Sequence, residues 1–276
     1  EVLSQCYDNV DYLSLHRYYG NKENDTPHFL ARSMDMDAFI KEVVSICDAV
    51  GAKKRNKKKI NLSFDEWNVW YHSNDQDQQL HKSDRWGRAL PLLEDVYNFE
   101  DALLVGAMLI TLLRNADRVK VACMAQLVNV IAPIMTRTGG GVWAQTIFYP
   151  LMQASTLGRG MALRPVIDCP TYACKDFDQV PLVDAAATMA DDGSVTIFAV
   201  NRSLTEAIAL DTDLRAFGDL RVAEHSVLHH DDVKAVNTEA APDTVTPVTG
   251  DAGQMDGGKL QITLPALSWN VIRLVK

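Results

Sequence analysis

The sequence predicts the C-terminal part of a (β/α)8 TIM barrel followed by a jelly-roll-like antiparallel β-sandwich. Three observations predict this fold. Over residues 1–158, strand-like and helix-like segments alternate at the spacing of parallel βαβ units. The loops after strands are long and those after helices short, as in a barrel whose active site lies on the loops after the strands. Over residues 159–276, helical periodicity disappears and strand-like runs alternate with turn-rich stretches.

The elements of the first domain follow in order along the chain. Strands are expected at 11–16, 59–64 and 118–129, helices at 35–50, 98–115 and 145–158, and long polar loops at 17–29 and 72–97. In the first helix, Phe39, Val43, Ile46 and Val50 share a face, which predicts that this face is buried. The last helix is expected to be interrupted near Pro150.

About three βα units are present, whereas a barrel needs eight. The chain also starts without Met and close to a strand-like segment, so we expect it to be a fragment of a longer protein that lacks the first part of the barrel. A doubly wound sheet is the competing fold, but no Gly-rich phosphate-binding loop supports it.

The second domain, 159–276, contains strand-like runs at 193–203, 220–230 and 258–276. A turn-rich stretch at 238–258 separates the last two. Acids and aromatics do not cluster at the ends of these strands, so we expect the domain to serve packing and assembly rather than chemistry.

Composition restricts the partners and the compartment. A net charge of −9 argues against nucleic acid, and the basic segment 53–59 is interpreted as a solvated loop rather than a nucleic-acid or localisation patch. The apolar run 102–113 is too short to cross a bilayer, and no signal peptide opens the chain. Five cysteines without metal-like spacing indicate reduced thiols and a cytoplasmic protein, with Cys47 and Cys123 in the core.

A carboxylate among aromatic residues is the leading candidate for chemistry. Glu66 follows the strand 59–64, where a barrel presents polar residues to its active site. Strand alternation predicts that Asp65 and Glu66 point to opposite sides. Trp67, Trp70 and Tyr71 suggest a sugar site, in which a desolvated carboxylate attacks an oxocarbenium-like centre. The structural alternative is an ion pair between Glu66 and a nearby Arg or Lys.

A second polar pair ends the preceding strand. His16 and Tyr18 alternate, so both can face one side and reach a carboxylate on the neighbouring strand. A tyrosine hydroxyl that donates to a nucleophilic carboxylate would orient it and lower its pKa. The alternative for His16 is a structural residue with satisfied hydrogen bonds.

Four motifs carry a family resemblance. They are "VDYLSLHRYYGN" (10–21), "INLSFDEWNVWYHS" (60–73), "QLVNVIAPIMT" (126–136) and "VWAQTIFYP" (142–150). In this order they resemble the C-terminal half of a glycoside hydrolase family 51 α-L-arabinofuranosidase, and the β-rich tail matches the jelly-roll-like domain of that family. "FDEWNVWY" is the most specific of these runs, whereas the tail alone would be weak support.

The resemblance implies a retaining mechanism on arabinose-containing oligosaccharides or polysaccharides, without a metal or organic cofactor, in a protein that often forms hexamers. It implies that Glu66 is the nucleophile and that Tyr18 orients it. It also implies that His16 lies beside the acid/base, that Trp70 lines the arabinofuranose pocket and that Gln145 contacts a sugar hydroxyl.

The sequence departs from this family at the second carboxyl. The family takes its acid/base from an Asn-Glu pair at the end of an earlier strand, and this sequence contains no Asn-Glu dipeptide. We therefore expect the acid/base to lie upstream of this chain. Two other functions stay open: a related barrel glycosidase acting on xylosides or glucans, and a non-catalytic carbohydrate-binding or structural fragment.

Overall fold

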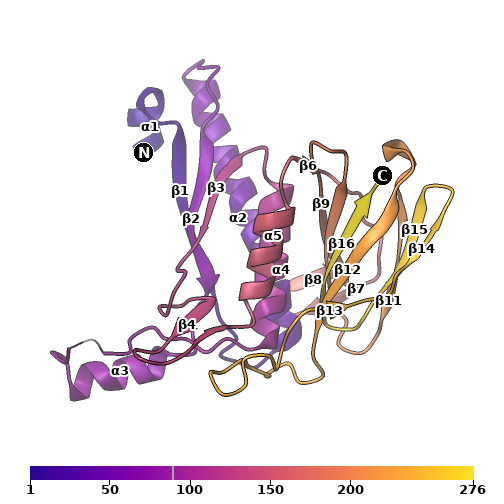
Figure 1. Ribbon diagram of the computed structural model, residues 1–276. Helices are drawn as coiled ribbons and strands as arrows, with labels where there is room; N and C mark the ends of the chain where they lie inside the picture. The colour runs from indigo at the N-terminus through magenta and orange to yellow at the C-terminus, as the bar shows by residue number, and fades with distance from the viewer. Residues whose placement is uncertain (89) are drawn as a thin grey trace.

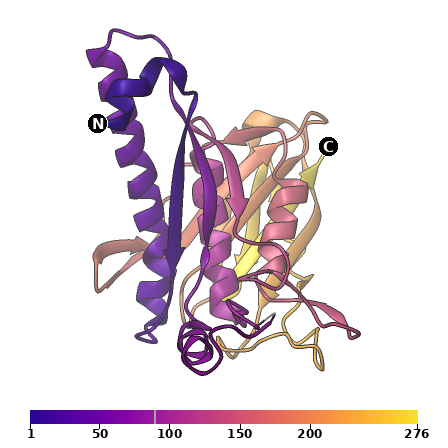
Figure 2. The ribbon, with the colours of Figure 1, turned by 90° about the vertical axis from the view of Figure 1, so that its left-hand side faces the viewer.

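The computed structural model describes residues 1–88 and 90–276, and it arranges them in layers (Figure 1). A three-stranded parallel sheet lies on one side, helices α2, α4 and α5 pack next to it, and two antiparallel sheets form the other side. A 90° turn of the molecule shows α2 running alongside the parallel sheet (Figure 2). This arrangement confirms the predicted fold class, although the sheets in this chain do not close into a barrel.

The first part of the chain contains α1 (Val2–Cys6), β1 (Tyr12–Tyr19), α2 (Thr26–Lys53), β2 (Asn61–Val69), α3 (Asn74–Ser83), α4 (Phe99–Arg114), β3 (Val119–Met124), β4 (Ile134–Thr136), β5 (Val142–Ala144) and α5 (Phe148–Leu157). The second part contains β6 (Met161–Leu163), β7 (Thr171–Cys174), β8 (Phe177–Pro181), β9 (Val183–Met189), β10 (Val195–Asn201), β11 (Ile208–Asp213), β12 (Arg221–His229), β13 (Val248–Thr249), β14 (Gln254–Asp256), β15 (Lys259–Leu264) and β16 (Ser268–Val275). Short 3₁₀ helices span Tyr7–Asn9 and Arg215–Phe217.

The parallel sheet has the order β1-β2-β3, with helices on one face (Figure 1). Along β1, Leu15 and Tyr19 are buried in the core shared with these helices, and the Tyr19 hydroxyl donates to Asp35 of α2 at 2.7 Å. Alternation sends His16 and Tyr18 to the other face, whereas Arg17 stays on the helix side and donates to Asp35 at 3.0 Å. The expected strand–helix order of a barrel is therefore present.

A bulge in β2 changes the predicted alternation. Ser14 pairs with Ser63, but His16 pairs with Glu66, so β2 contains one more residue than β1 over this stretch. The pairing of β2 with β3 shifts over the same part of β2. An extra residue in one strand re-aims the side chains that follow it. The prediction that Asp65 and Glu66 point to opposite sides is therefore wrong, since both carboxylates contact His16.

Helix α2 is longer than predicted, because Asp25 caps it by accepting from the His28 backbone N–H and Pro27 stands in its first turn. Its buried stripe includes Met36, Ile40, Val43 and Cys47. Val43 is buried and Phe39 and Val50 pack against the same core, as predicted. Ile46 is 57% exposed, so the prediction is wrong at that residue.

The predicted polar loop 72–97 contains a helix, α3, and residue 89 of that loop lies outside the described residues. Helix α4 matches its predicted bounds because Asn98 and Asp101 form a reciprocal capping box at its start. Helix α5 begins at Phe148, so Pro150 lies in its first turn and does not interrupt it. The predicted interruption is therefore wrong.

Helix α4 joins the two parts of the molecule. It is apolar on nearly all sides because it contacts both the parallel sheet and strands β9, β10 and β16. Gly106 permits this close approach, since a Cβ there would lie 2.5 Å from Cε3 of the fully buried Trp269 on β16. The indole Nε1 of Trp269 donates to Gln153 of α5 at 2.7 Å.

The second part is the predicted β-sandwich. Its larger sheet has the order β13-β12-β16-β10-β9-β6, and its smaller sheet has the order β11-β15-β14. Apolar side chains from both sheets, among them Ile197 and Leu274 of the first and Leu260 and Ile262 of the second, form a separate core cluster. The sandwich therefore has its own core in addition to its contact with α4.

The third strand of the parallel sheet lies at its edge. Cys123 and Val121 of β3 are exposed, which contradicts the prediction that Cys123 is a core residue. Among the described residues, no strand pairs with the outer side of β3 or of β1. In a closed barrel the edges of β1 and β3 would be paired with further strands. Here the sheet is open, and Cys123 is exposed because it lies on the unpaired edge strand β3.

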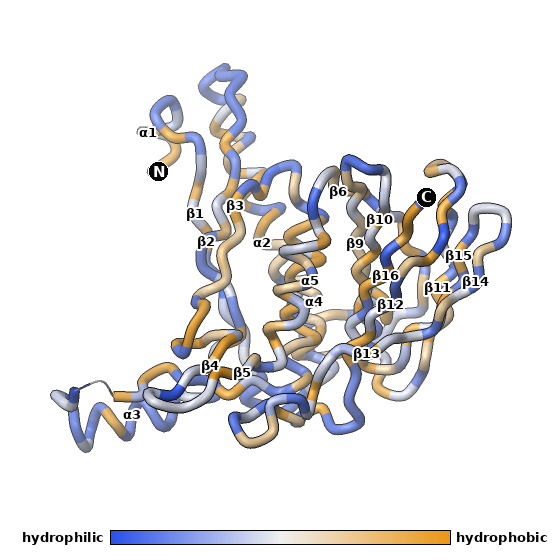
Figure 3. The backbone as a smooth tube through the Cα atoms, in the orientation of Figure 1, coloured by the Kyte–Doolittle hydropathy of each residue, from blue (hydrophilic) through white to orange (hydrophobic). Residues whose placement is uncertain are grey.

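The basic segment 53–59 forms the hydrophilic turn after α2, as Figure 3 shows. Lys58 pairs with Asp11 at 2.8 Å and Lys59 with Asp48 at 3.2 Å, so neighbouring acids partly neutralise it. In the described part of the chain, the helices are too short or too polar to span a membrane.

Candidate active site

A row of polar side chains lies on the face of the parallel sheet that points away from the helices. Ser14, His16 and Tyr18 alternate along β1, and the bulge in β2 brings Asp65 and Glu66 next to them. This row runs toward the carboxyl ends of the strands, where parallel sheets and barrels place their binding sites.

Glu66 is held by two groups from β1. The Tyr18 hydroxyl donates to its Oε1 at 2.5 Å, and Nδ1 of His16 lies 3.0 Å from its Oε2. Both carboxylate oxygens therefore have a fixed partner, while 41% of the side chain stays exposed. No Arg or Lys forms an ion pair with Glu66 among the described residues, so the structural alternative of a cationic partner lacks support.

Asp65 lies on the other side of the same imidazole. Ser14 Oγ donates to its Oδ1 at 2.7 Å, and Nε2 of His16 lies 3.4 Å from that oxygen. The hydrogen bond from Ser14 is the main reason why the pKa of Asp65 is lowered, with a smaller contribution from His16. Asp65 is therefore held in its ionised form, and His16 lies between two carboxylates.

Tyr18 stays a neutral donor. Burial, the hydrogen bond to Glu66 and the negative charge of that carboxylate raise the pKa of Tyr18 well above its ordinary value. A phenol that keeps its proton at all working pH values can donate continuously to Glu66. This is the geometry of a group that orients a carboxylate and stabilises its charge.

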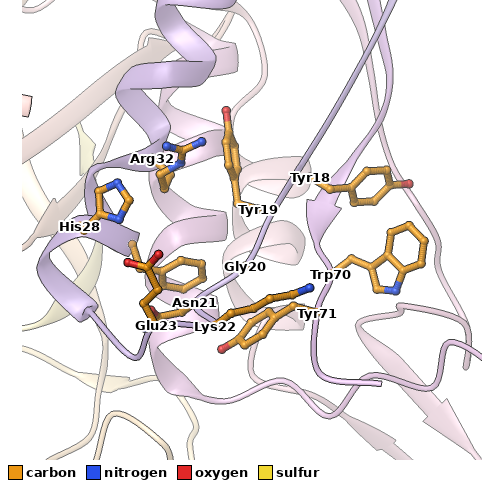
Figure 4. Close-up of a pocket in the computed structure, with 11 residues that line it drawn as sticks. Tyr18, Tyr19, Gly20, Asn21, Lys22, Glu23, His28, Arg32, Trp70 and Tyr71 are labelled. Atoms are coloured by element: carbon orange, nitrogen blue, oxygen red, sulfur yellow. The ribbon is translucent and has the colours of Figure 1, made fainter. Parts of the chain in front are cut away.

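Trp70 provides an aromatic wall beside this pair. Its ring meets that of Tyr18 edge to face, with centroids 5.4 Å apart and the side chain partly exposed. Figure 4 shows both rings pointing to the same side, away from His28 and Arg32. A pocket of about 270 Å³ lies next to them, and Lys22 extends across it toward Trp70.

Buried acidic residues hold the loop after β2 in place. Asp95, which is fully buried, accepts the backbone N–H groups of Tyr71 and His72 at 3.0 Å each and that of Ser73 at 2.9 Å. His72 Nε2 lies 2.7 Å from the buried Asp101. Burial lowers the pKa of His72, but the hydrogen bond to Asp101 and the neighbouring carboxylates outweigh this and raise it overall.

Gln145 lies at the same end of the sheet but inside the protein. It is 1% exposed, its Nε2 donates to the carbonyls of Asp95 and Ala132 at 3.0 and 2.8 Å, and its Oε1 accepts from the Tyr97 N–H at 2.9 Å. These backbone groups take both N–H donors and one acceptor position of its amide in this structure. A contact between Gln145 and a sugar hydroxyl stays a prediction, and the structure does not bring Gln145 into contact with Glu66 or His16.

The structure thus brings Glu66, Tyr18, His16 and Trp70 together and adds residues that sequence reasoning missed. Ser14 had a usable signal, since it precedes His16 by two residues and so shares its face. Asp95 had none, because it lies in an irregular loop more than twenty residues after Trp70.

Comparisons with known proteins extend this description. A family model described as "Alpha-L-arabinofuranosidase C-terminal domain" matches residues 65–268. An intracellular exo-alpha-(1->5)-L-arabinofuranosidase of Halalkalibacterium halodurans is 56% identical over 276 residues, which are 100% of this chain and 54% of that protein. A similarly named enzyme of Bacillus subtilis is 54% identical and matches 100% of this chain and 54% of its own length.

A solved structure gives the same result. A family 51 alpha-L-arabinofuranosidase from Bifidobacterium longum superposes with a TM-score of 0.91 at 37% identity, covering 99% of this chain and 56% of that one. The chain therefore spans about half the length of the relatives that it matches.

Proposed function

The chain belongs to the α-L-arabinofuranosidases of glycoside hydrolase family 51, and we propose that it provides the nucleophile of a retaining glycosidase. The substrates are arabinose-containing oligosaccharides or polysaccharides, from which the enzyme removes terminal α-L-arabinofuranosyl residues. Within this chain, residues 1–158 contribute the last part of the catalytic barrel, and residues 159–276 form the β-sandwich domain. We place the enzyme in the cytoplasm and expect it to act as an oligomer.

The observation that carries this proposal is the arrangement around Glu66. Its two oxygens are held by Tyr18 and His16 on a face that is open to solvent, beside the aromatic ring of Trp70. A fixed carboxylate with restricted rotation is preorganised to attack an anomeric carbon that approaches from the open face. Trp70 offers a ring for the C–H face of the sugar.

The reaction has two displacements. In the first, a Glu66 oxygen bonds to the anomeric carbon while the glycosidic C–O bond breaks and the departing oxygen takes a proton from an acid. In the second, water attacks the same carbon, the bond to Glu66 breaks and the acid group recovers its proton. As the first bond forms, negative charge leaves Glu66, and the Tyr18 hydroxyl loses its strongest acceptor.

We propose that the acid/base carboxyl comes from the part of the relatives that this chain does not span. A retaining enzyme needs it about 5–5.5 Å from the nucleophile. Asp65 is the nearest acid to Glu66 among the residues described above, but its lowered pKa suits it poorly to protonate a leaving group.

The test uses a polypeptide of the relatives' full length that contains this chain, called the full-length enzyme below. Glu66→Ala should lower turnover of an aryl α-L-arabinofuranoside by about 10³-fold or more, because covalent catalysis is lost. Azide should restore turnover in this variant and yield the arabinosyl azide of inverted configuration, since the small anion fills the vacated position.

Asp65→Ala is the matched control, since Asp65 contacts the same imidazole. It should not be rescued by azide or form the inverted azide. Near-wild-type turnover by Glu66→Ala, or azide rescue of Asp65→Ala instead, would show that the nucleophile is placed wrongly.

A further inference from the structure

The segment that carries Trp70 has one feature that the proposed chemistry does not explain. Immediately after Trp70, three consecutive backbone N–H groups, those of Tyr71, His72 and Ser73, point at the two oxygens of Asp95. Asp95 is fully buried, so water does not compete for these contacts. Hydrogen bonds to an ionised acceptor in such surroundings are stronger than those between neutral groups.

We propose that Asp95 is a positioning residue that fixes Trp70 against Tyr18 and thereby sets the aromatic wall of the sugar site. This inference rests on the proposed function of Glu66 and Tyr18. Trp70 is held on one side by its own N–H, which donates to the Tyr19 carbonyl at 2.9 Å. On the other side it is held by the three amides on Asp95.

The side chain of Trp70 needs this backbone support. It is 36% exposed and therefore lacks the all-round packing that would fix a core residue. Its edge-to-face contact with Tyr18 therefore depends on the position of the Trp70 backbone. A shift of Trp70 would first displace the ring proposed to contact the sugar. Because Tyr18 donates to Glu66, the shift would have a smaller, indirect effect on the nucleophile.

The backbone of Asp95 is also held by hydrogen bonds. Its carbonyl accepts from Gln145 Nε2 at 3.0 Å, and Gln145 Oε1 accepts from the N–H of Tyr97 at 2.9 Å. The Tyr97 hydroxyl donates to the carbonyl of Val69, the residue just before Trp70, at 2.8 Å. The acid is thus part of a closed buried network that returns to the end of β2.

A purely structural role would also explain a buried acid, and the chain offers a matched control. Asp77 is 8% exposed, accepts from Ser73 Oγ at 2.8 Å and accepts from the Leu93 N–H at 3.0 Å. It therefore stabilises the far end of the same loop without contacting the N–H groups of Tyr71 or His72. Asp95→Asn and Asp77→Asn make the same substitution at two buried positions.

In the full-length enzyme, Asp95→Asn should raise KM for an aryl α-L-arabinofuranoside by about 10-fold or more with a smaller change in kcat, because a displaced Trp70 weakens the binding of substrate and transition state alike. Asp77→Asn should lower the unfolding temperature but leave KM within about 3-fold of wild type, since it does not hold Trp70. Equal effects of the two variants on KM would overturn the proposal.

A measurement independent of catalysis separates this inference from the proposed function. Hydrogen exchange followed by mass spectrometry should show slow exchange at Tyr71, His72 and Ser73 in the wild-type protein and faster exchange in Asp95→Asn. Fast exchange of these amides in the wild type would refute the inference even if the variant does not fold. Absent glycosidase activity in a wild type with slow exchange at these amides would count against the proposed function alone.

Discussion

The Tyr18 hydroxyl donates to Oε1 of Glu66 at 2.5 Å across a strand pair in which Glu66 stands opposite His16. This relationship exists because β2 contains one extra residue just before Glu66. Without the bulge, strict alternation would send one of the two adjacent carboxylates to the helix side of the sheet. The bulge therefore lets two adjacent carboxylates share one imidazole.

Removing the Tyr18 hydroxyl should affect the chemical step. In the full-length enzyme, Tyr18→Phe should lower kcat for an aryl α-L-arabinofuranoside by about 10- to 100-fold, because Glu66 loses one of the two groups that fix its orientation toward the anomeric carbon. KM should change little, since the ring and its contact with Trp70 remain. Tyr12→Phe is the control: Tyr12 lies on the same strand, is 49% exposed and should leave kcat unchanged. An unchanged kcat in Tyr18→Phe would contradict the orienting role.

The pair of His72 and Asp101 should make stability depend on pH. The pKa of His72 is raised in the folded protein above its ordinary value of about 6.5, so folding favours the protonated form. The resulting stabilisation is fully present below the unfolded pKa and is lost as pH rises through the folded pKa. The unfolding temperature should therefore fall more steeply in the wild type than in His72→Asn as the pH rises above about 6.5.

His81→Asn serves as the control for this pH dependence, because His81 lies on the exposed surface of α3. Its pH profile should follow that of the wild type. Parallel profiles for the wild type and His72→Asn would show that the pair does not contribute in this range.

A buried charge cluster should stabilise the contact between the helices and the β-sandwich. Asp184 of β9 accepts from Arg114 at 2.6 Å and from Arg202 at 2.7 Å, and both Asp184 and Arg202 are almost fully buried. Asp184→Asn leaves these guanidinium groups without their carboxylate, which typically costs about 3–5 kcal/mol. We expect the unfolding temperature to fall by roughly 10 °C.

The exposed pair of Asp213 and Arg215 is the matched control for this cluster. Asp213→Asn should change the unfolding temperature by about 1–2 °C at most, because surface ion pairs contribute little. Similar losses for both variants would show that burial of the Asp184 cluster has no special effect.

The sequence predicted the elements whose signals are local. The Asn98 cap and Asp101 fixed the start of α4, and the polar alternation of His16 and Tyr18 indicated which face of β1 carries the candidate site. These features depend on residues within four positions of each other, which periodicity and capping rules describe well.

Other features depend on contacts that no local pattern shows. The bulge before Glu66 depends on pairing with two neighbouring strands. The hydrogen bonds of Asp95 depend on a loop that brings it back to residues more than twenty positions earlier in the chain. The sequence predicted Cys123 in the core because its strand is apolar. Cys123 is exposed because β3 is an edge strand among the described residues. Tertiary pairing overrides the local pattern in each case.

The most direct test of the central claim is covalent trapping of the nucleophile. The full-length enzyme is incubated with an activated arabinofuranoside whose glycosyl-enzyme hydrolyses slowly, then digested and sequenced by tandem mass spectrometry. We predict one modified peptide, from the region of residues 60–73, with the arabinosyl group on the carboxylate of Glu66. Attachment to Asp65 or to a residue outside this region, or product of inverted configuration without a trapped intermediate, would contradict the account.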